Sequence, residues 1–435
     1  MCAARFHARA VNKVWLTTYI LAASLILATS MIFHLSNLFN LSCNLDVKSL
    51  HLLLLLTVAP LAASTALAQA PREHASDGIR KALQPFVDSH SLAGAVTLVA
   101  DKDRILAMEA VGYSDVAAAK PMRTNALFWI ASQSKPITAT ALMMLVDEGK
   151  VHLDDPVAKY LPEFSSQWLI IHQDTDHALL KRPRHPITIR EILSHTSGLP
   201  FSSAMEQPTL DLLPLKVAVR SYAISPLVYE PGTQYQYSNA GINTAGRIIE
   251  VVSGIPYEKF LVDRLFTPLG MKDTTFRPNK RQIARLANAY KPNEAKTGLE
   301  ETTITQCHYP LDAPNRYPFP AGGLFSTADD LAHFCRMILN HGVYGGKRFI
   351  SEDSMKQMTS KQTGDSLPDG YGLGWSTGGG VFGHGGAYAT NMSIDTNRGL
   401  ITIWLVQHAG YPNNGDQSYG AFLQAVGAIY GHPVK

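Results

Sequence analysis

A serine and a lysine stand three residues apart at the start of an apolar stretch, as Ser132 and Lys135 of FWIASQSKPITATALMMLVDEGK, residues 128–150. On a helix these positions share one face, so the lysine amine can reach the serine hydroxyl. A hydroxyl is a weak nucleophile until a base takes its proton, and a desolvated lysine can be that base. A serine in the first helical turn also places its backbone N–H where an oxyanion is stabilised. The pair predicts a nucleophile with its own base, although the spacing alone arises on the order of once by chance in such a chain.

Two other segments carry side chains suited to the same chemistry. Residues 235–246, YQYSNAGINTAG, place a Tyr-Ser-Asn triplet after a Pro-Gly turn and before a helical pattern. A tyrosine can relay a proton to a leaving group, and an asparagine can bind a substrate amide or carbonyl. Residues 384–386, His-Gly-Gly, fall between two strand patterns, where glycines let a substrate backbone lie close to a sheet edge. Taken alone, each segment is more simply explained as a capped loop or a glycine-rich hairpin.

Two motifs for other chemistries carry less weight. GWSTG at 374–378 matches the G-x-S-x-G nucleophile elbow, but Gly379, Gly380 and another strand pattern follow where that elbow needs a helix. HQDTDH at 172–177 resembles an H-x-H-x-D-H zinc-binding run, but Asp174 replaces the central histidine. We interpret both as structural segments, the second as a solvated loop.

The N-terminal region contains the parts of a secretory signal at residues 47–70. Lys48 is a basic start, residues 52–61 are an apolar body, and ALA at 66–68 is a small-residue cleavage site. We expect cleavage after Ala68, which predicts a periplasmic or secreted protein. Residues 1–68 then form the signal region, and 69–435 form the folded domain.

The residues before this signal allow two interpretations. A signal peptide usually stands at the start of a protein, so residues 1–46 are expected to lie outside the translated chain, with Val47 read from a GTG start codon. Alternatively, residues 14–35 are a genuine membrane anchor, whose length fits a span although Ser, Thr and His dilute it. The intact mass of the precursor distinguishes the two.

The composition is that of a globular protein with material for a large core. The chain has 435 residues, of which 46% are hydrophobic and 17% charged, with a formal charge of +3. Removal of 1–68 takes away four of 38 basic and one of 35 acidic residues, which leaves 34 of each. No charge argument therefore favours a nucleic-acid or membrane partner for the mature chain. Only Cys307 and Cys335 remain, whose pairing stays open, and two thiols so spaced are no metal framework.

The order of the patterns predicts an α+β fold. Strand patterns occur near both ends of the mature chain, and residues from about 150 to 340 are mostly short helical patterns and Pro-rich loops. We expect one antiparallel sheet formed by both chain ends, flanked by helices, with a mostly helical insertion at about 150–340. The principal expected elements are a helix at 76–90, strands at 93–100 and 104–112, the serine helix at 132–149, and a closing helix at 418–431.

Together the three segments resemble the serine β-lactamase-related superfamily, which includes class C β-lactamases, D-alanyl-D-alanine carboxypeptidases and esterases of the same fold. That group has S-x-x-K, then Y-x-N, then a K- or H-x-G triad, and here they begin at 132, 237 and 384. The likeness covers about 75–430, and the joint pattern is specific where its parts are not. Other agreeing stretches are HTSGLP (195–200), YEPGTQYQYSNAG (229–241), PAGGLFSTADDLAHF (320–334) and YGLGW (371–375).

The resemblance implies a role for each matched residue. Ser132 would be the acylated nucleophile, Lys135 its base, and Tyr237 the proton shuttle to the leaving group. The backbone N–H groups of Ser132 and Ala387 would form the oxyanion hole. Substrate would be bound by Asn239, His384, Gly385 and Gly386. His195, in HTSGL, we interpret as structural, satisfying backbone groups near the cleft. The resemblance also implies catalysis without a metal or organic cofactor.

The third motif departs from that of the β-lactamases, which usually have lysine first and a hydroxyl residue second. Here His384 and Gly385 stand in those places. The missing cation and hydroxyl favour an esterase- or peptidase-like hydrolase acting on a small-molecule or cell-wall-peptide acyl substrate. Two alternatives stay open: a weak class C-type β-lactamase, and a non-catalytic module that binds penicillin or peptidoglycan.

Overall fold

The computed structural model describes residues 77–364 and 370–431. The chain divides after Ala70, and all described residues belong to the unit Pro71–Lys435. The predicted signal, its cleavage site after Ala68 and the candidate anchor at 14–35 lie outside the described residues. Within the described part, no helix is long and apolar enough to cross a membrane.

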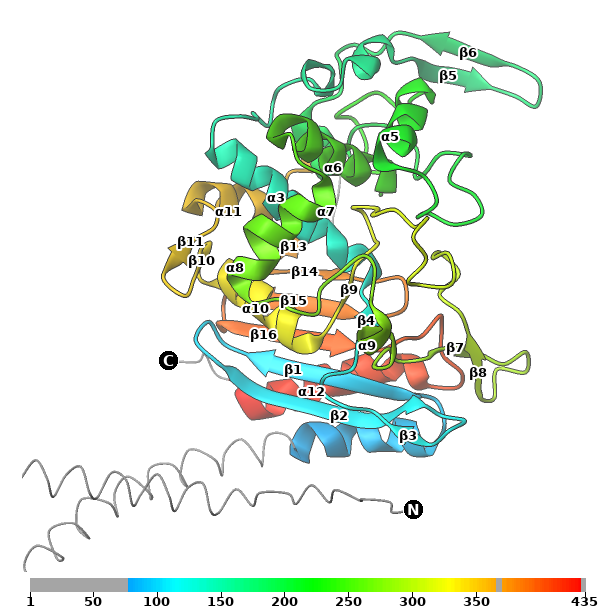
Figure 1. Cartoon of the computed structure of the whole chain (residues 1–435), viewed down its shortest axis with the longest axis vertical. Coiled ribbons are helices and arrows are strands. Elements are labelled where there is room, and N and C mark those ends of the chain that lie inside the picture. The colour runs from blue at the N-terminus through cyan, green and yellow to red at the C-terminus, as the bar shows by residue number, and fades with distance from the viewer. Residues whose placement is uncertain (1–76, 365–369, 432–435) are drawn as a thin grey trace, which may run out of the picture. The chain divides into compact units, whose positions relative to one another are not determined.

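Both ends of the described chain meet in one antiparallel eight-stranded sheet (Figure 1). The N-terminal strand β1 (Gly94–Ala100) pairs with the last strand, β16 (Leu400–Leu405), with Thr97 opposite Trp404. This pairing confirms the predicted α+β fold. The sheet order is β12-β13-β14-β15-β16-β1-β2-β3, and the other strands are β2 (Ile105–Asp115), β3 (Lys120–Pro121), β12 (Gly370–Tyr371), β13 (Ser376–Gly378), β14 (Val381–Gly385) and β15 (Asn391–Asp395).

Helices cover both faces of the sheet, which is why every residue of β1 is buried. On one face, a helix at 77–88 and α12 (Ser418–Tyr430) bury Leu83 and Phe422 with Trp404 of β16. On the other face, α10 (Ala328–Leu339) packs on β1 and β16 (Figure 1). The two faces of β1 thus belong to two apolar clusters, as the alternation of a strand requires.

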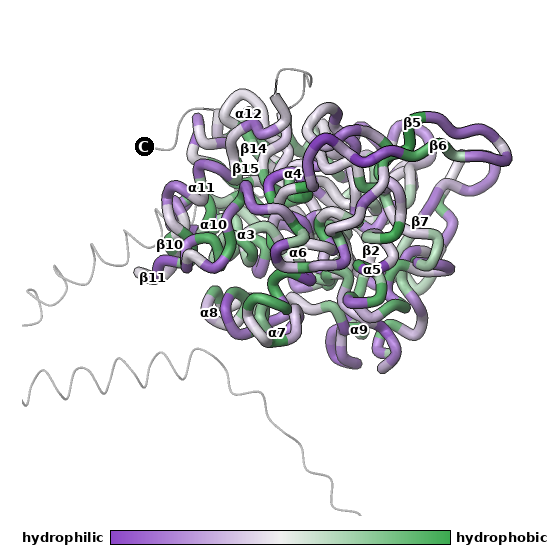
Figure 2. Tube along the Cα trace, turned by 90° about the horizontal axis from the view of Figure 1, so that it is seen from above, coloured by the Kyte–Doolittle hydropathy of each residue, from purple (hydrophilic) through white to green (hydrophobic). Residues whose placement is uncertain are grey.

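The segment predicted as mostly helical, about 150–340, contains short strands as well as helices. The hairpin β5 (Leu169–Gln173)–β6 (Ala178–Lys181) projects from the body, with hydrophilic residues along its turn (Figure 2). Its turn falls within HQDTDH, whose side chains are exposed. In the same segment β7 (Ala289–Pro292) pairs with β8 (Leu299–Thr302), and β9 (Phe325–Ser326) pairs with β4 (Phe128–Trp129), which precedes the segment. The helices are α4 (Ile189–Leu193), α5 (Leu215–Ile224), α6 (Asn239–Ser253), α7 (Tyr257–Leu261), α8 (Thr267–Leu269) and α9 (Lys280–Ile283), with α11 (Glu352–Thr359) further on.

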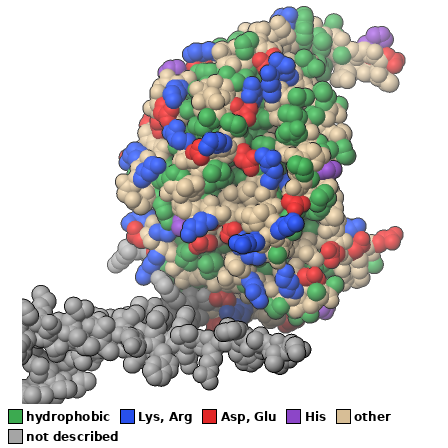
Figure 3. All heavy atoms as spheres, in the orientation of Figure 1, with side chains coloured by type: hydrophobic (Ala, Val, Ile, Leu, Met, Phe, Trp, Pro, Cys, Tyr) green, Lys and Arg blue, Asp and Glu red, His purple; other side chains and the backbone are tan. Residues whose placement is uncertain are grey.

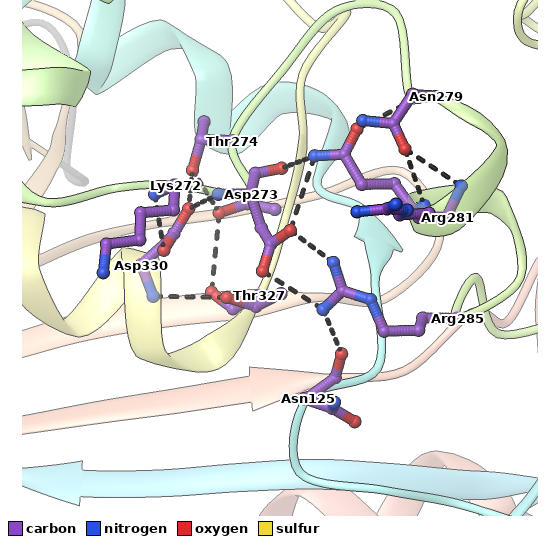
Figure 4. Close-up of polar contacts among 11 residues, drawn as sticks. Asn125, Lys272, Asp273, Thr274, Asn279, Arg281, Arg285, Thr327 and Asp330 are labelled. Carbon is purple, nitrogen blue, oxygen red and sulfur yellow. Dashed lines mark hydrogen bonds and ion pairs between the residues drawn. The ribbon is translucent and has the colours of Figure 1, made fainter.

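A polar network fixes the chain around β9 (Figure 4). Asp330, in the first turn of α10, accepts hydrogen bonds from the backbone N–H of Asp273 at 2.8 Å and the Thr274 hydroxyl at 2.7 Å. Asp273 forms an ion pair with Arg285, which also donates to the Asn125 carbonyl at 2.9 Å. These contacts tie α10 to the segments that carry β4 and β9. The β4–β9 pair leads directly into the candidate serine turn.

On the face shown in Figure 3, Lys and Arg side chains lie among Asp and Glu side chains. This distribution agrees with the near balance of basic and acidic residues in the sequence.

A buried ion pair joins two loops of the insertion. Arg316 Nε donates to Asp211 Oδ2 at 2.7 Å, and the two side chains are only 2% and 0% exposed. Asp211 also accepts the His308 N–H and the Thr209 hydroxyl. The Asp211 carboxylate therefore accepts hydrogen bonds from three residues.

Asp211→Ala is expected to lower the free energy of unfolding by about 3–5 kcal/mol, because it leaves the Arg316 charge buried without its partner. Denaturant unfolding measures this change. The matched control is Asp263→Ala, which breaks an exposed i,i+4 pair with Lys259 and should cost ~0.5 kcal/mol or less. Equal losses in both variants would contradict the importance given to the buried pair.

Candidate active site

Ser132 lies in a 3₁₀ turn (Ala131–Gln133) that runs directly into α3 (Ser134–Asp147). The predicted helix at 132–149 thus begins two residues later as an α-helix, with the serine in the tighter turn before it. Ala131 has φ +46°, a left-handed conformation that costs a non-glycine residue about 1–2 kcal/mol. The turn is held by Ser134 Oγ, which donates to the Ala131 carbonyl at 2.7 Å and accepts the Leu324 N–H at 3.2 Å.

Lys135 is fully buried beneath Ser132 and has three oxygen neighbours. Its Nζ lies 3.0 Å from Ser132 Oγ, 2.8 Å from Asn239 Oδ1 and 2.7 Å from the Ala321 carbonyl. Burial holds the pKa of Lys135 well below its usual value. A neutral amine has two N–H donors and one lone pair. When the amine is neutral, the Asn239 and Ala321 oxygens can accept its two N–H groups, which leaves its lone pair for the proton of Ser132.

Tyr237 comes from the loop before α6 and points at the same serine. Ser238 is the N-cap of α6, with its hydroxyl accepting the Gly241 N–H at 3.2 Å, so Tyr237 sits one residue before the helix. Burial raises the pKa of the Tyr237 phenol, and a smaller effect of its hydrogen bond with Ser132 lowers it. The phenol is therefore protonated at neutral pH and can donate a proton. Lys135 Nζ lies 4.5 Å from the centre of its ring.

Asn239 is the first residue of α6, where its Oδ1 accepts from Lys135. In the part of the chain that the structure describes, no residue accepts a hydrogen bond from its Nδ2. That amide donor is thus free to bind a carbonyl oxygen of a substrate. The same side chain would orient both the base and the substrate.

His195 packs behind the tyrosine and is structural, as expected. Its Nδ1 accepts the Ser238 N–H at 3.2 Å, and its ring centre lies 4.6 Å from those of Tyr237 and Tyr371. The residue has φ +61°, which turns the chain so that the ring lies under the tyrosines. Burial holds the pKa of His195 well below its usual value, so the ring is neutral.

His384 lies within strand β14 rather than between two strands, which corrects the sequence interpretation. Its Nδ1 is 2.7 Å from the Gly385 carbonyl, which only accepts, so this nitrogen carries the proton. Nε2 then accepts from the Tyr371 hydroxyl at 3.0 Å. Burial lowers the pKa of His384 to about 3. The residue at the start of the third motif is therefore uncharged at neutral pH.

The turn after β14 approaches the serine turn closely because residue 386 is glycine. A Cβ there would lie 2.7 Å from the Ile130 carbonyl and 2.1 Å from Thr390 Oγ1. Within residues 77–364 and 370–431, neither the Ser132 N–H nor the Ala387 N–H has a hydrogen-bond acceptor. Gly386 thus brings together two free donors suited to an oxyanion. Gly385 lies on the exposed part of β14, where its lack of a side chain leaves the strand open.

The described residues support neither the nucleophile elbow at GWSTG nor the zinc site at HQDTDH. Ser376 lies on β13, and a glycine turn and β14 follow it rather than a helix. Among the described residues, no group of three or more His, Cys, Asp and Glu side chains could hold a metal ion. Cys307 and Cys335 are both buried and both free.

The fold and this site define the class of β-lactamase-fold serine hydrolases. The chain belongs to the Beta-lactamase family, whose family model matches residues 79–425. Protein Rv1367c of Mycobacterium tuberculosis is 31% identical over 76% of this chain and 90% of its own length. Esterase EstB of Burkholderia gladioli is 28% identical over 73% of this chain and 86% of its own length. Among solved structures, EstCE1, a hydrolase with promiscuous acyltransferase activity, has the same fold, with a TM-score of 0.67 and 24% identity over 81% of this chain and 98% of its own.

Tyr237→Phe is expected to lower kcat for ester hydrolysis by roughly 10²–10⁴-fold, as loss of a general acid does. The phenyl ring keeps the packing against His195, so the melting temperature should change little. Steady-state kinetics with ethyl butyrate, whose alkoxide leaving group needs a proton, and a thermal melt measure the two quantities. Full retained activity would remove Tyr237 from the mechanism.

Proposed function

We propose that this protein is an exported serine hydrolase that cleaves carboxylic esters through an acyl-enzyme on Ser132. The observation that carries the proposal is the environment of Lys135, whose Nζ lies 3.0 Å from Ser132 Oγ in a buried position that holds its pKa well below the usual value. A charged surface lysine at this spacing would have no such role.

Acylation would proceed through four groups. Lys135 Nζ takes the proton of Ser132, and Oγ attacks the ester carbonyl carbon. The N–H groups of Ser132 and Ala387 bind the oxyanion that forms. As the intermediate collapses, the bond to the alcohol oxygen breaks and Tyr237 supplies the proton that this oxygen needs. Water then attacks the acyl-enzyme by the reverse path, which releases the acid and restores Ser132.

The neutral state of His384 supports an esterase rather than an efficient β-lactamase. A lysine in this place would offer a charge-assisted hydrogen bond, worth about 1.5–3 kcal/mol, to a substrate carboxylate. His384 offers none, because its Nδ1–H is bound to Gly385 and its Nε2 accepts from Tyr371.

Parallel assays of the purified domain distinguish the proposal from its alternatives. We expect turnover of p-nitrophenyl butyrate with kcat/KM at least roughly 10-fold above that for a chromogenic cephalosporin, since one charge-assisted contact is missing. Faster cephalosporin turnover would establish the weak β-lactamase instead. Stable labelling by penicillin without turnover of any substrate would establish the binding module.

We also propose that the chain is exported and processed after Ala68, since residues 47–70 have the composition of a signal. N-terminal sequencing of the protein from the source cell tests this. A mature protein that begins at Gln69 is the expected result, and one that retains residues 14–35 would support the membrane anchor.

A further inference from the structure

A cavity of about 620 Å³ adjoins the candidate site at β14. His384 and Gly385 of β14, Tyr371 of β12 and Tyr235 from the loop before α6 form the side nearest to the site. Asn391 of β15 and Tyr419 of α12 belong to the rest of the wall. The volume is that of a site for a small organic molecule.

The side of the cavity that His384 and Tyr371 form lies close to Tyr237, the proton donor of the proposed mechanism. The ring of His384 is 6.0 Å from that of Tyr237. Tyr235 and Tyr371 both pack on His195, whose own ring contacts Tyr237. In the proposed mechanism Tyr237 protonates the alcohol oxygen. The alcohol oxygen of a bound ester would then lie beside Tyr237, and the His384 wall of the cavity is close to that residue.

The described lining of the cavity holds no formal charge. Among the described residues that line it, none is Lys, Arg, Asp or Glu, and His384 is neutral. Its wall offers tyrosine rings for apolar contact, and the Asn391 amide and Ser393 hydroxyl for hydrogen bonds. Such a wall accepts aromatic rings and uncharged hydrogen-bonding groups, but it leaves a carboxylate without a counter-ion.

We propose that this cavity is the subsite for the alcohol half of the ester, and that it selects uncharged, ring-sized alcohols over alcohols that carry a carboxylate. Tyr371 acts here as a positioning residue, because its hydroxyl occupies His384 Nε2 and holds that ring in its uncharged tautomer. The inference rests on the proposed function and adds to it the class of substrate.

Two esters that differ only in charge test the selection: 4-carbamoylphenyl butyrate and 4-carboxyphenyl butyrate. For each, kcat/KM is divided by the rate of its alkaline hydrolysis, which removes the difference between the leaving groups. The wild type is expected to favour the carbamoyl ester roughly 10- to 100-fold, the factor for one unpaired charge. Equal values for the two esters would overturn the inference and leave the esterase intact. No turnover of either ester beyond that of Ser132→Ala would refute the proposed function itself.

Adding a cation to the cavity should reduce this selection. His384→Lys and Ser376→Lys, the second at an exposed position of the lining, are each expected to narrow the ratio at least 5-fold, since the carboxylate gains a counter-ion. The matched control is Ile224→Lys, which adds the same charge on α5 at a side chain that is 81% exposed and outside the lining. If the carbamoyl-to-carboxy ratio of kcat/KM in both cavity variants equals that of the control, the inference is overturned. If neither cavity variant folds, as judged by thermal melting, the wild-type ratio decides alone.

Discussion

Replacing Ser132 with alanine is expected to reduce hydrolysis of p-nitrophenyl butyrate to the background rate, a loss of at least about 10⁴-fold in kcat, as removal of a serine nucleophile does. The alanine removes one hydroxyl from a half-exposed position, so the melting temperature should be unchanged. Steady-state assays of residues 69–435, with a thermal melt of each protein, measure both effects.

The control for this variant is Ser89→Ala, which changes an exposed serine at the end of the helix at 77–88. It should retain full activity. Equal turnover by Ser132→Ala and the wild type would mean that the nucleophile lies elsewhere. No turnover by any of the three proteins would favour a strict peptidase or a non-catalytic binder.

Lys135→Met is expected to lower kcat by roughly 10²–10⁴-fold, because the methionine keeps the length of the side chain and removes the base. KM should change much less, since Lys135 contacts Ser132 rather than the substrate. Pre-steady-state release of p-nitrophenol isolates the acylation step, which should slow by the same factor. Activity of the wild type should also fall as the pH decreases through the lowered pKa of Lys135, because the protonated amine is no base.

The same substitution changes how stability depends on pH. Burial depresses the pKa of Lys135 in the folded protein, so between this depressed pKa and the ordinary lysine pKa the unfolded chain binds more protons than the folded one. Stability therefore rises with pH from the depressed pKa up to about 10.4, the ordinary lysine value. Lys135→Met should remove this part of the slope, as denaturant unfolding at pH 7 and pH 9.5 would reveal. An identical slope in both proteins would show that Lys135 is an ordinary charged lysine.

The family and the fold could be predicted from the sequence because their signals are local. The buried strands at both ends, such as β1, are short apolar runs bounded by turns, and the prediction of one sheet from both ends is confirmed. The order of the three motifs and their resemblance to a known family selected Ser132, Lys135 and Tyr237, which the structure brings together. Their catalytic roles remain predictions.

Other parts had no local signal. Strand β14 has two glycines in five residues, so its pairing with β15 rather than its composition makes it a strand. The hairpin β5–β6 is mostly exposed and lacks an apolar face that a pattern could reveal. Tyr371 was visible only as part of YGLGW, because its bond to His384 joins two strands 13 residues apart in the chain.

The most direct test of the central claim is the mass of the protein trapped during turnover. Wild-type enzyme is mixed with p-nitrophenyl butyrate, quenched in acid within the first turnovers, and measured intact and after digestion. We predict a mass increase of one butyryl group, located on the peptide that contains Ser132 and absent from Ser132→Ala. Continued turnover with the label on another residue would contradict the account.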